Sequence, residues 1–174
     1  MGEYSRSRCR EWALQFLYQA EFAGPHRPEA VEQFWKHFGP LLIFRAIRAG
    51  STLMSLKNFG LKVGPVRPII HVSLMESNPP AYLKDLAEGV TAHQEELDVF
   101  IVRYSEHWRL ERMTIVDRNL LRLSIHELLY QPNIPVKVVI NEAVEMAKRY
   151  GSEASGGFVN GILDQVRMSV GRKV

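Results

Sequence analysis

The sequence predicts an all-α fold, and two stretches with helical spacing carry that prediction. Residues 114–166 contain three consecutive helical patterns with short connections between them. Residues 4–22 contain a further apolar stripe at the same spacing. Three helices joined so closely have to fold back on one another to bury their stripes. We therefore expect a core made of packed helices in a single domain spanning residues 1–174.

The first helix of residues 114–166 is expected to begin directly after Thr114. Thr114 and Asp117 have the spacing of a capping box, whose side chains satisfy free backbone amides at a helix start. The apolar residues that follow form a broad face, and Arg118, Arg122 and His126 share the opposite face. This helix is predicted to pack through its leucine-rich side.

The next two helices are bounded by proline, glycine and serine. Pro132 and Pro135 stop the preceding helix, and Pro135 suits the first turn of the next one, where a missing amide costs nothing. Gly151 is expected to end that second helix as a left-handed cap. Ser155 is expected to open the third helix, with Phe158 at the edge of its apolar stripe.

The amino-terminal stretch predicts a helix that starts with arginines. Arg6 and Arg10 would point toward the apolar stripe, and unpaired arginines do not fit in a core. Either the helix overhangs the core, or the arm is extended and Arg6, Arg8 and Arg10 project from one side. In both cases we expect these arginines to be available to a partner, with a solvated helix start as the alternative.

The middle of the chain is less regular. Residues 28–38 predict a short second helix, and residues 39–78 predict an insertion, a basic loop with a possible short strand at 66–72. From residue 80 the helical pattern continues to Trp108, and Gly89 inside it indicates close packing or a kink rather than an end.

Composition and motifs favour a binding module over an enzyme. The net charge is +3, and Cys9 is the single cysteine, which excludes an internal disulfide and is typical of a reducing cytosol. The histidines lack metal-ligand spacing, and no nucleotide-binding loop or nucleophile motif occurs. No apolar run is long enough to cross a membrane. We expect a cytoplasmic protein without a catalytic site, metal or cofactor.

Two blocks of the sequence resemble the NusB family of bacterial transcription antitermination factors. The segments LLRLSIHELLY, IPVKVVINEAVEMAKRYG and FVNGILDQV carry the likeness, and SRSRCREWALQFLYQ is similar to the family's arginine-rich first helix. The likeness covers residues 4–22 and 81–168, whereas residues 39–78 have no recognisable counterpart. It implies two small helix bundles packed together, with about six to seven helices in all.

The resemblance also implies partners. Family members bind the boxA element of ribosomal RNA leader transcripts together with NusE, a small-subunit ribosomal protein, in a complex that keeps RNA polymerase elongating. A homodimer of the free protein is left open. By position, the RNA-binding arginine motif falls on Arg6, Arg8 and Arg10.

Further contacts carried over by position fall on the carboxy-terminal half. RNA contacts fall on Tyr104, Phe158 and the loop at Ala154 and Ser155, although Ala154 stands where the family has a polar or acidic residue. The NusE-facing surface includes the start of the capped helix, which implies Asp117 and Arg118.

Single-stranded RNA is held by arginine contacts to phosphates and by bases stacked on aromatic rings. Arginines at the start of one helix, with Tyr104 and Phe158 nearby in space, would supply both. Core packing is the alternative for Tyr104 and Phe158. Two other functions remain open: an RNA-binding domain like those at the front of ribosomal RNA cytosine methyltransferases, and a helical scaffold that binds only protein.

Overall fold

The computed structural model describes residues 4–23, 30–38, 79–105 and 108–171. Every regular element within these ranges is helical, and they contain no strand, so the all-α prediction is confirmed. The predicted helix at 28–38 is confirmed for residues 30–38. The predicted insertion at 39–78 and its possible strand lie outside the described residues.

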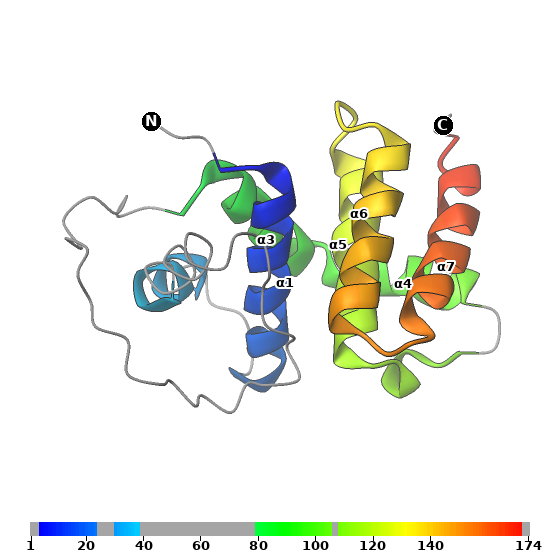
Figure 1. The fold of residues 1–174 in the computed structure, drawn as a ribbon, viewed down its shortest axis with the longest axis horizontal. Coiled ribbons are helices and arrows are strands. Elements are labelled where there is room, and N and C mark those ends of the chain that lie inside the picture. Colours follow the sequence, from blue (N-terminus) through cyan, green and yellow to red (C-terminus); the bar gives the residue numbers. More distant parts are fainter. Residues whose placement is uncertain (1–3, 24–29, 39–78, 106–107, 172–174) are drawn as a thin grey trace.

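Two groups of helices lie side by side, as the resemblance implied (Figure 1). The amino-terminal group contains α1 (Arg6–Ala23), the helical residues 30–38 and α3 (Ala81–Ala92). The second group contains α4 (Gln94–Tyr104), the short 3-10 helix η3 (Leu110–Arg112), α5 (Ile115–Tyr130), α6 (Val136–Tyr150) and α7 (Ser155–Ser169). Helix α5 packs against α1 and α3 as well as α4, α6 and α7, and so joins the two groups.

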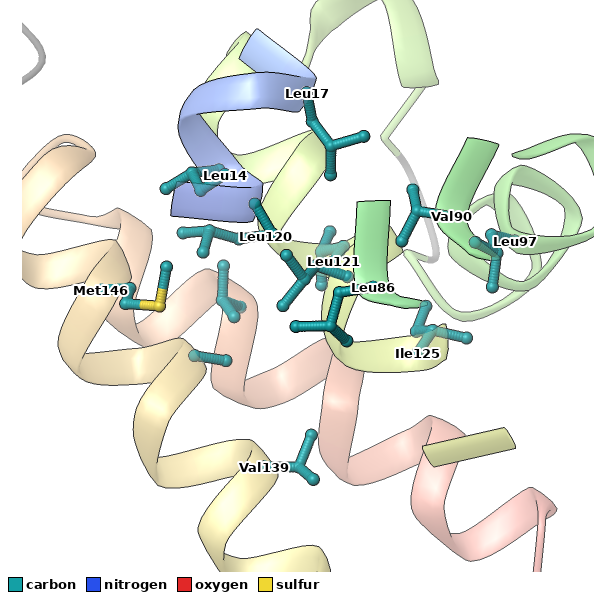
Figure 2. Packing of buried hydrophobic residues seen from close by; sticks show 14 of the residues in the cluster. Leu14, Leu17, Leu86, Val90, Leu97, Leu120, Leu121, Ile125, Val139 and Met146 are labelled. Atoms are coloured by element: carbon teal, nitrogen blue, oxygen red, sulfur yellow. The ribbon is translucent and has the colours of Figure 1, made fainter. Parts of the chain in front are cut away.

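Helix α5 is buried along most of its length. Leu120, Leu121 and Ile125 lie in the same core as Leu86 of α3 and Leu14 of α1 (Figure 2). Helices also cover the side of α5 opposite its leucines, so two of the three polar side chains predicted there are buried too: Arg122 is 5% exposed and His126 is 3% exposed, whereas Arg118 is half-buried. Helix α5 therefore has to satisfy charged groups inside the protein.

The predicted continuous helix from residue 80 to Trp108 is wrong, because the chain breaks at His93 into α3 and α4. The His93 ring bonds the carbonyl oxygen of Gly89 through Nδ1 at 2.9 Å and stacks on Tyr130 at a centroid distance of 4.3 Å. Close packing at Gly89 is confirmed, because a Cβ added there would lie 2.3 Å from Cε1 of His126.

The predicted end of α6 at Gly151 is confirmed, but the predicted left-handed conformation of that residue is wrong. Its backbone is extended, with φ −92° and ψ −160°, rather than left-handed. A Cβ at Gly151 would lie 2.4 Å from Oγ of Ser155, so glycine is needed there for close approach. The predicted helix starts are confirmed: Thr114 Oγ1 accepts a hydrogen bond from the Asp117 amide at 3.0 Å, and α7 begins at Ser155.

Candidate nucleic-acid interface

The start of α1 presents an arginine to solvent. Arg6 is exposed, and its guanidinium lies 5.4 Å from the ring centroid of Tyr82 on α3. Arg8 is half-buried and forms an ion pair with Glu11 at 3.1 Å. A cation over an aromatic face is held by the ring quadrupole, so the Tyr82 ring orients Arg6, which has no ion pair within the described part of the chain.

Arg10 is 2% exposed, so the expectation that it is available to a partner is wrong for this structure. Its Nε and Nη2 donate to the Glu127 carboxylate at 2.9 Å and 2.8 Å, and Glu127 is itself fully buried. Burial alone would lower the pKa of Arg10, but the hydrogen bonds and charge of Glu127 raise it. The core accommodates this arginine because a carboxylate from α5 pairs with it.

The Glu127 carboxylate also holds Tyr82, whose ring lies beside the exposed Arg6. The Tyr82 hydroxyl donates to Glu127, and burial together with this carboxylate raises the pKa of Tyr82 well above its usual value. Arg10 also lies 3.8 Å from Glu142 on α6, which accepts a hydrogen bond from Ser7. Helices α1, α3, α5 and α6 thus meet in one polar network beneath Arg6.

Sequence reasoning missed Tyr82, Glu127 and Glu142 as parts of this network. Glu127 lies 117 positions from Arg10 and 45 positions from Tyr82, so no local spacing connects them. The one available signal was a charged residue, Glu127, on a helix whose other positions are mostly apolar. A buried charge of this kind requires a partner of opposite charge.

The carboxy-terminal candidates differ in exposure. Phe158 is half-buried, and its ring meets the exposed Trp108 ring edge-on at a centroid distance of 5.4 Å. Tyr104 is half-buried and packs against the core, with the Arg103 guanidinium 5.5 Å from its ring centroid. Ser155 is only 1% exposed, because its Oγ accepts the Ser152 amide at 2.9 Å inside the loop. Ser155 therefore stabilises the conformation of the loop and is not part of its exposed surface.

The structure does not bring the arginines together with Phe158. The start of α1 and the start of α7 lie at opposite ends of the helix array (Figure 1). The expectation that one small site contains both is therefore wrong. An RNA that touched both regions would have to run along the molecule.

Of the two positions carried over as NusE-facing, Asp117 is buried and Arg118 is engaged in contacts within the chain. Asp117 is 5% exposed, and its Oδ1 has no hydrogen-bond partner among the described residues. Arg118 pairs with Glu21 at 3.0 Å and donates to the carbonyl oxygen of Leu110 at 3.3 Å. Arg122 joins the same Glu21 at 2.7 Å, so this cluster fastens the start of α5 to the end of α1.

Two further observations concern the described part of the chain alone. None of its helices is long and apolar enough to cross a membrane. Its histidine, cysteine, aspartate and glutamate side chains form no group of three that could hold a metal ion.

Comparison with known proteins gives a consistent result. A sequence model described as the NusB family matches residues 69–168. The transcription antitermination protein NusB of Desulfitobacterium hafniense (strain DSM 10664 / DCB-2) is 54% identical, covering 97% of this chain and 92% of that protein. The protein of the same name from Myxococcus xanthus (strain DK1622) is 39% identical, covering 97% of this chain and 98% of that protein.

Solved structures are similar along almost the whole chain. T. maritima NusB has a TM-score of 0.66 and 31% identity, covering 96% of this chain and 93% of that one. A chain from the crystal structure of antitermination factors NusB and NusE in complex with dsRNA has a TM-score of 0.58 and 24% identity, covering 94% and 96%. At that identity the second likeness concerns the fold alone.

Proposed function

The chain belongs to the NusB family of transcription antitermination proteins, and we propose that it binds the boxA element of ribosomal RNA leader transcripts together with NusE. In the proposed role it works in the cytoplasm, in an antitermination complex that keeps RNA polymerase elongating, and it catalyses no reaction. Supporting this proposal, a relative 54% identical along nearly the whole chain is an antitermination protein. A protein of the same fold is found with NusE and RNA.

One observation carries the RNA-binding part of the proposal: Arg6 is exposed at the start of α1, lies over the Tyr82 ring and has no ion pair with a carboxylate of the described residues. A guanidinium in this state can contact a phosphate without first breaking an ion pair. We assign phosphate contacts to Arg6 and to the half-buried Arg8. Arg10 is assigned a supporting role beneath them, because Glu127 already occupies its donors.

The remaining candidates are assigned by position. Tyr104 and Phe158 are proposed to contact bases, and both are half-buried, so each has a surface to offer. Ser155 is proposed to hold the loop before α7 in shape. Asp117 and Arg118 are proposed to face NusE, with Arg118 presented by its contact to Glu21.

Titration of labelled boxA RNA against a scrambled RNA of equal length tests the function directly. We expect tighter binding to boxA, a further gain when NusE is added, and a steep loss of affinity as salt rises. Equal, weak binding to both RNAs that NusE leaves unchanged contradicts the proposal.

Replacing Arg6 and Arg8 by glutamine tests the assigned phosphate contacts. Each lost contact should flatten the plot of log K against log salt by roughly 0.7, the value for a single strand. Arg167→Gln is the matched control: it also removes one arginine, which is paired with Asp164 on α7 as Arg8 is paired with Glu11 on α1. A salt slope that stays the same in the Arg6 and Arg8 variants would show that these arginines do not touch the RNA.

A further inference from the structure

Most arginines among the described residues are paired with carboxylates. Ion pairs hold six of them: Arg8, Arg10, Arg118, Arg122, Arg149 and Arg167. The other four described arginines have no ion pair with a described carboxylate, and apart from Arg6 all of them lie between residues 103 and 112. These three, Arg103, Arg109 and Arg112, are exposed. The last turn of α4 and the connection from α4 to α5 therefore hold three of the four described arginines that have no ion pair with a described carboxylate.

Charge balance in this connection favours an anionic partner. Residues 103–112 contain three arginines and two glutamates, Glu106 and Glu111, so three positive minus two negative charges leave a net charge of +1 with histidine neutral. Unpaired guanidinium groups keep their donors free for phosphate oxygens.

An exposed tryptophan lies in the same connection. Trp108 is 53% exposed, whereas Trp12 and Trp35 are 1% and 2% exposed. Its backbone is held on both sides by Ser105: the Trp108 amide donates to the Ser105 carbonyl at 3.1 Å, and the Ser105 hydroxyl donates to the Trp108 carbonyl at 3.0 Å. Ser105 is buried, so a large aromatic ring is presented to solvent from a fixed point.

Phe158 of α7 supports this ring. The two ring centroids lie 5.4 Å apart with an interplanar angle of 63°, so the contact is edge to face. An edge-to-face contact is one of the favoured arrangements of aromatic pairs, and here it leaves more than half of the Trp108 side chain exposed.

We propose that Trp108, backed by Phe158 and flanked in the chain by Arg103, Arg109 and Arg112, forms a second RNA-contacting surface that stacks an unpaired base and contacts its phosphates. This inference rests on the proposed function and extends it to the end of the molecule away from Arg6. Stacking on an aromatic ring together with arginine contacts to the backbone is how single-stranded RNA is commonly held. The strand that Arg6 contacts at the start of α1 thus continues along the protein to the α4–α5 connection.

Tryptophan fluorescence with acrylamide quenching tests the surface, because Trp108 is accessible to acrylamide while Trp12 and Trp35 are buried. We expect boxA RNA, added to the full chain with NusE present, to protect Trp108 from quenching. In Trp108→Phe that accessible signal should be absent from the start, which identifies its source.

Affinity measurements give the second readout. Trp108→Leu should weaken RNA binding by roughly fivefold to a hundredfold, the range expected when one base stack is lost. Trp108→Phe keeps an aromatic face, so its RNA affinity should lie between those of the leucine variant and the wild type. Arg109→Gln with Arg112→Gln should flatten the salt slope by roughly 1.4, two single-strand contacts. Lys137→Gln with Arg167→Gln is the matched control, since it removes two cations from the start of α6 and the end of α7. Thermal melting confirms that each variant remains folded.

The outcomes separate this inference from the proposed function. The proposed Trp108 surface is contradicted if the protein binds boxA RNA selectively while acrylamide still quenches Trp108 fully and Trp108→Leu binds as tightly as the wild type. The proposed function would still stand in that case. Protection of Trp108 by NusE without RNA also overturns the proposed surface, because it then docks a protein. Protection by boxA and scrambled RNA alike supports the surface and contradicts boxA selectivity.

Discussion

At the scale of single residues, Glu127 joins the two helix groups through charge. It is fully buried, it accepts from Arg10 of α1 and Tyr82 of α3, and it lies on α5. Removing one partner of a buried ion pair leaves the other charge uncompensated in a medium that solvates it poorly. The accessible Arg6 depends on this arrangement, because its guanidinium lies over the ring that Glu127 anchors.

Glu127→Gln keeps the side-chain volume but removes the carboxylate that pairs closely with the buried Arg10 cation, leaving only Glu142 at 3.8 Å. We expect the free energy of unfolding, measured by urea denaturation, to fall by about 3–5 kcal/mol. Glu145→Gln is the control: its side chain is 65% exposed and pairs with Lys148, so its loss should leave the free energy of unfolding almost unchanged. Equal losses in the two variants would mean that Glu127 is not structurally required.

At the scale of elements, α3 approaches α5 closely at Gly89, four residues before the break between α3 and α4 at His93. Gly89 lies against the His126 ring, and that ring is hemmed in by His93 at 5.9 Å and Tyr130 at 5.0 Å between ring centroids. A methyl group at residue 89 has no room unless α3 moves away from α5.

Gly89→Ala should therefore destabilise the protein by about 1–3 kcal/mol through overpacking, despite the better helix propensity of alanine. Gly161→Ala on α7 is the matched control, because a Cβ there meets nothing within 4 Å. That change should stabilise by up to about 1 kcal/mol. Opposite signs in chemical denaturation are the expected result, and stabilisation by both changes would show that α3 and α5 do not pack this tightly.

At the scale of the whole molecule, α5 is the element that both helix groups share (Figure 1). The His126 ring of α5 lies against Gly89 of α3. His126 is 3% exposed, and neither ring nitrogen has a hydrogen-bond partner among the described residues. Burial lowers the pKa of His126 below its ordinary value of 6.5, with His93 acting in the same direction and Asp85 against it. The folded protein therefore keeps this imidazole neutral.

The sign of the pH effect follows from proton linkage. Below pH 6.5 the unfolded chain binds a proton at His126 more readily than the folded protein does. The free energy of unfolding should then be fully retained above pH 6.5 and fall as pH drops toward the lowered folded pKa. Urea midpoints measured at pH 7.5 and about pH 5.5 test this expectation.

Comparing the stability of each variant at the two pH values identifies the histidine that causes the loss of stability at low pH. His126→Phe should show a smaller loss between the two pH values than the wild type, whatever its absolute stability. The exposed His37, replaced by phenylalanine, serves as the control and should leave the pH dependence as it is. An undiminished loss in the His126 variant would assign the effect to other groups.

The sequence by itself determined the helical class, the helix starts at Thr114 and Ser155 and the family resemblance that comparison confirms. Caps, prolines and apolar spacing act over a few residues, so they can be recognised without knowing the fold. The wrong prediction at His93 concerns a position that packs on the Tyr130 ring, 37 residues away. At Gly151 the end of the helix was predicted, and only the extended backbone beside the Ser155 hydroxyl was not.

Only the tertiary structure decided which arginines are accessible. Arg6 and Arg10 lie one helical turn apart and look equivalent in the sequence, yet Arg10 is buried and Arg6 is exposed. The difference arises because Glu127, 117 positions away, supplies the charge that makes burial of Arg10 tolerable. Likewise, the contact of Trp108 with Phe158 joins residues 50 positions apart, a proximity that helix packing creates and local spacing does not encode.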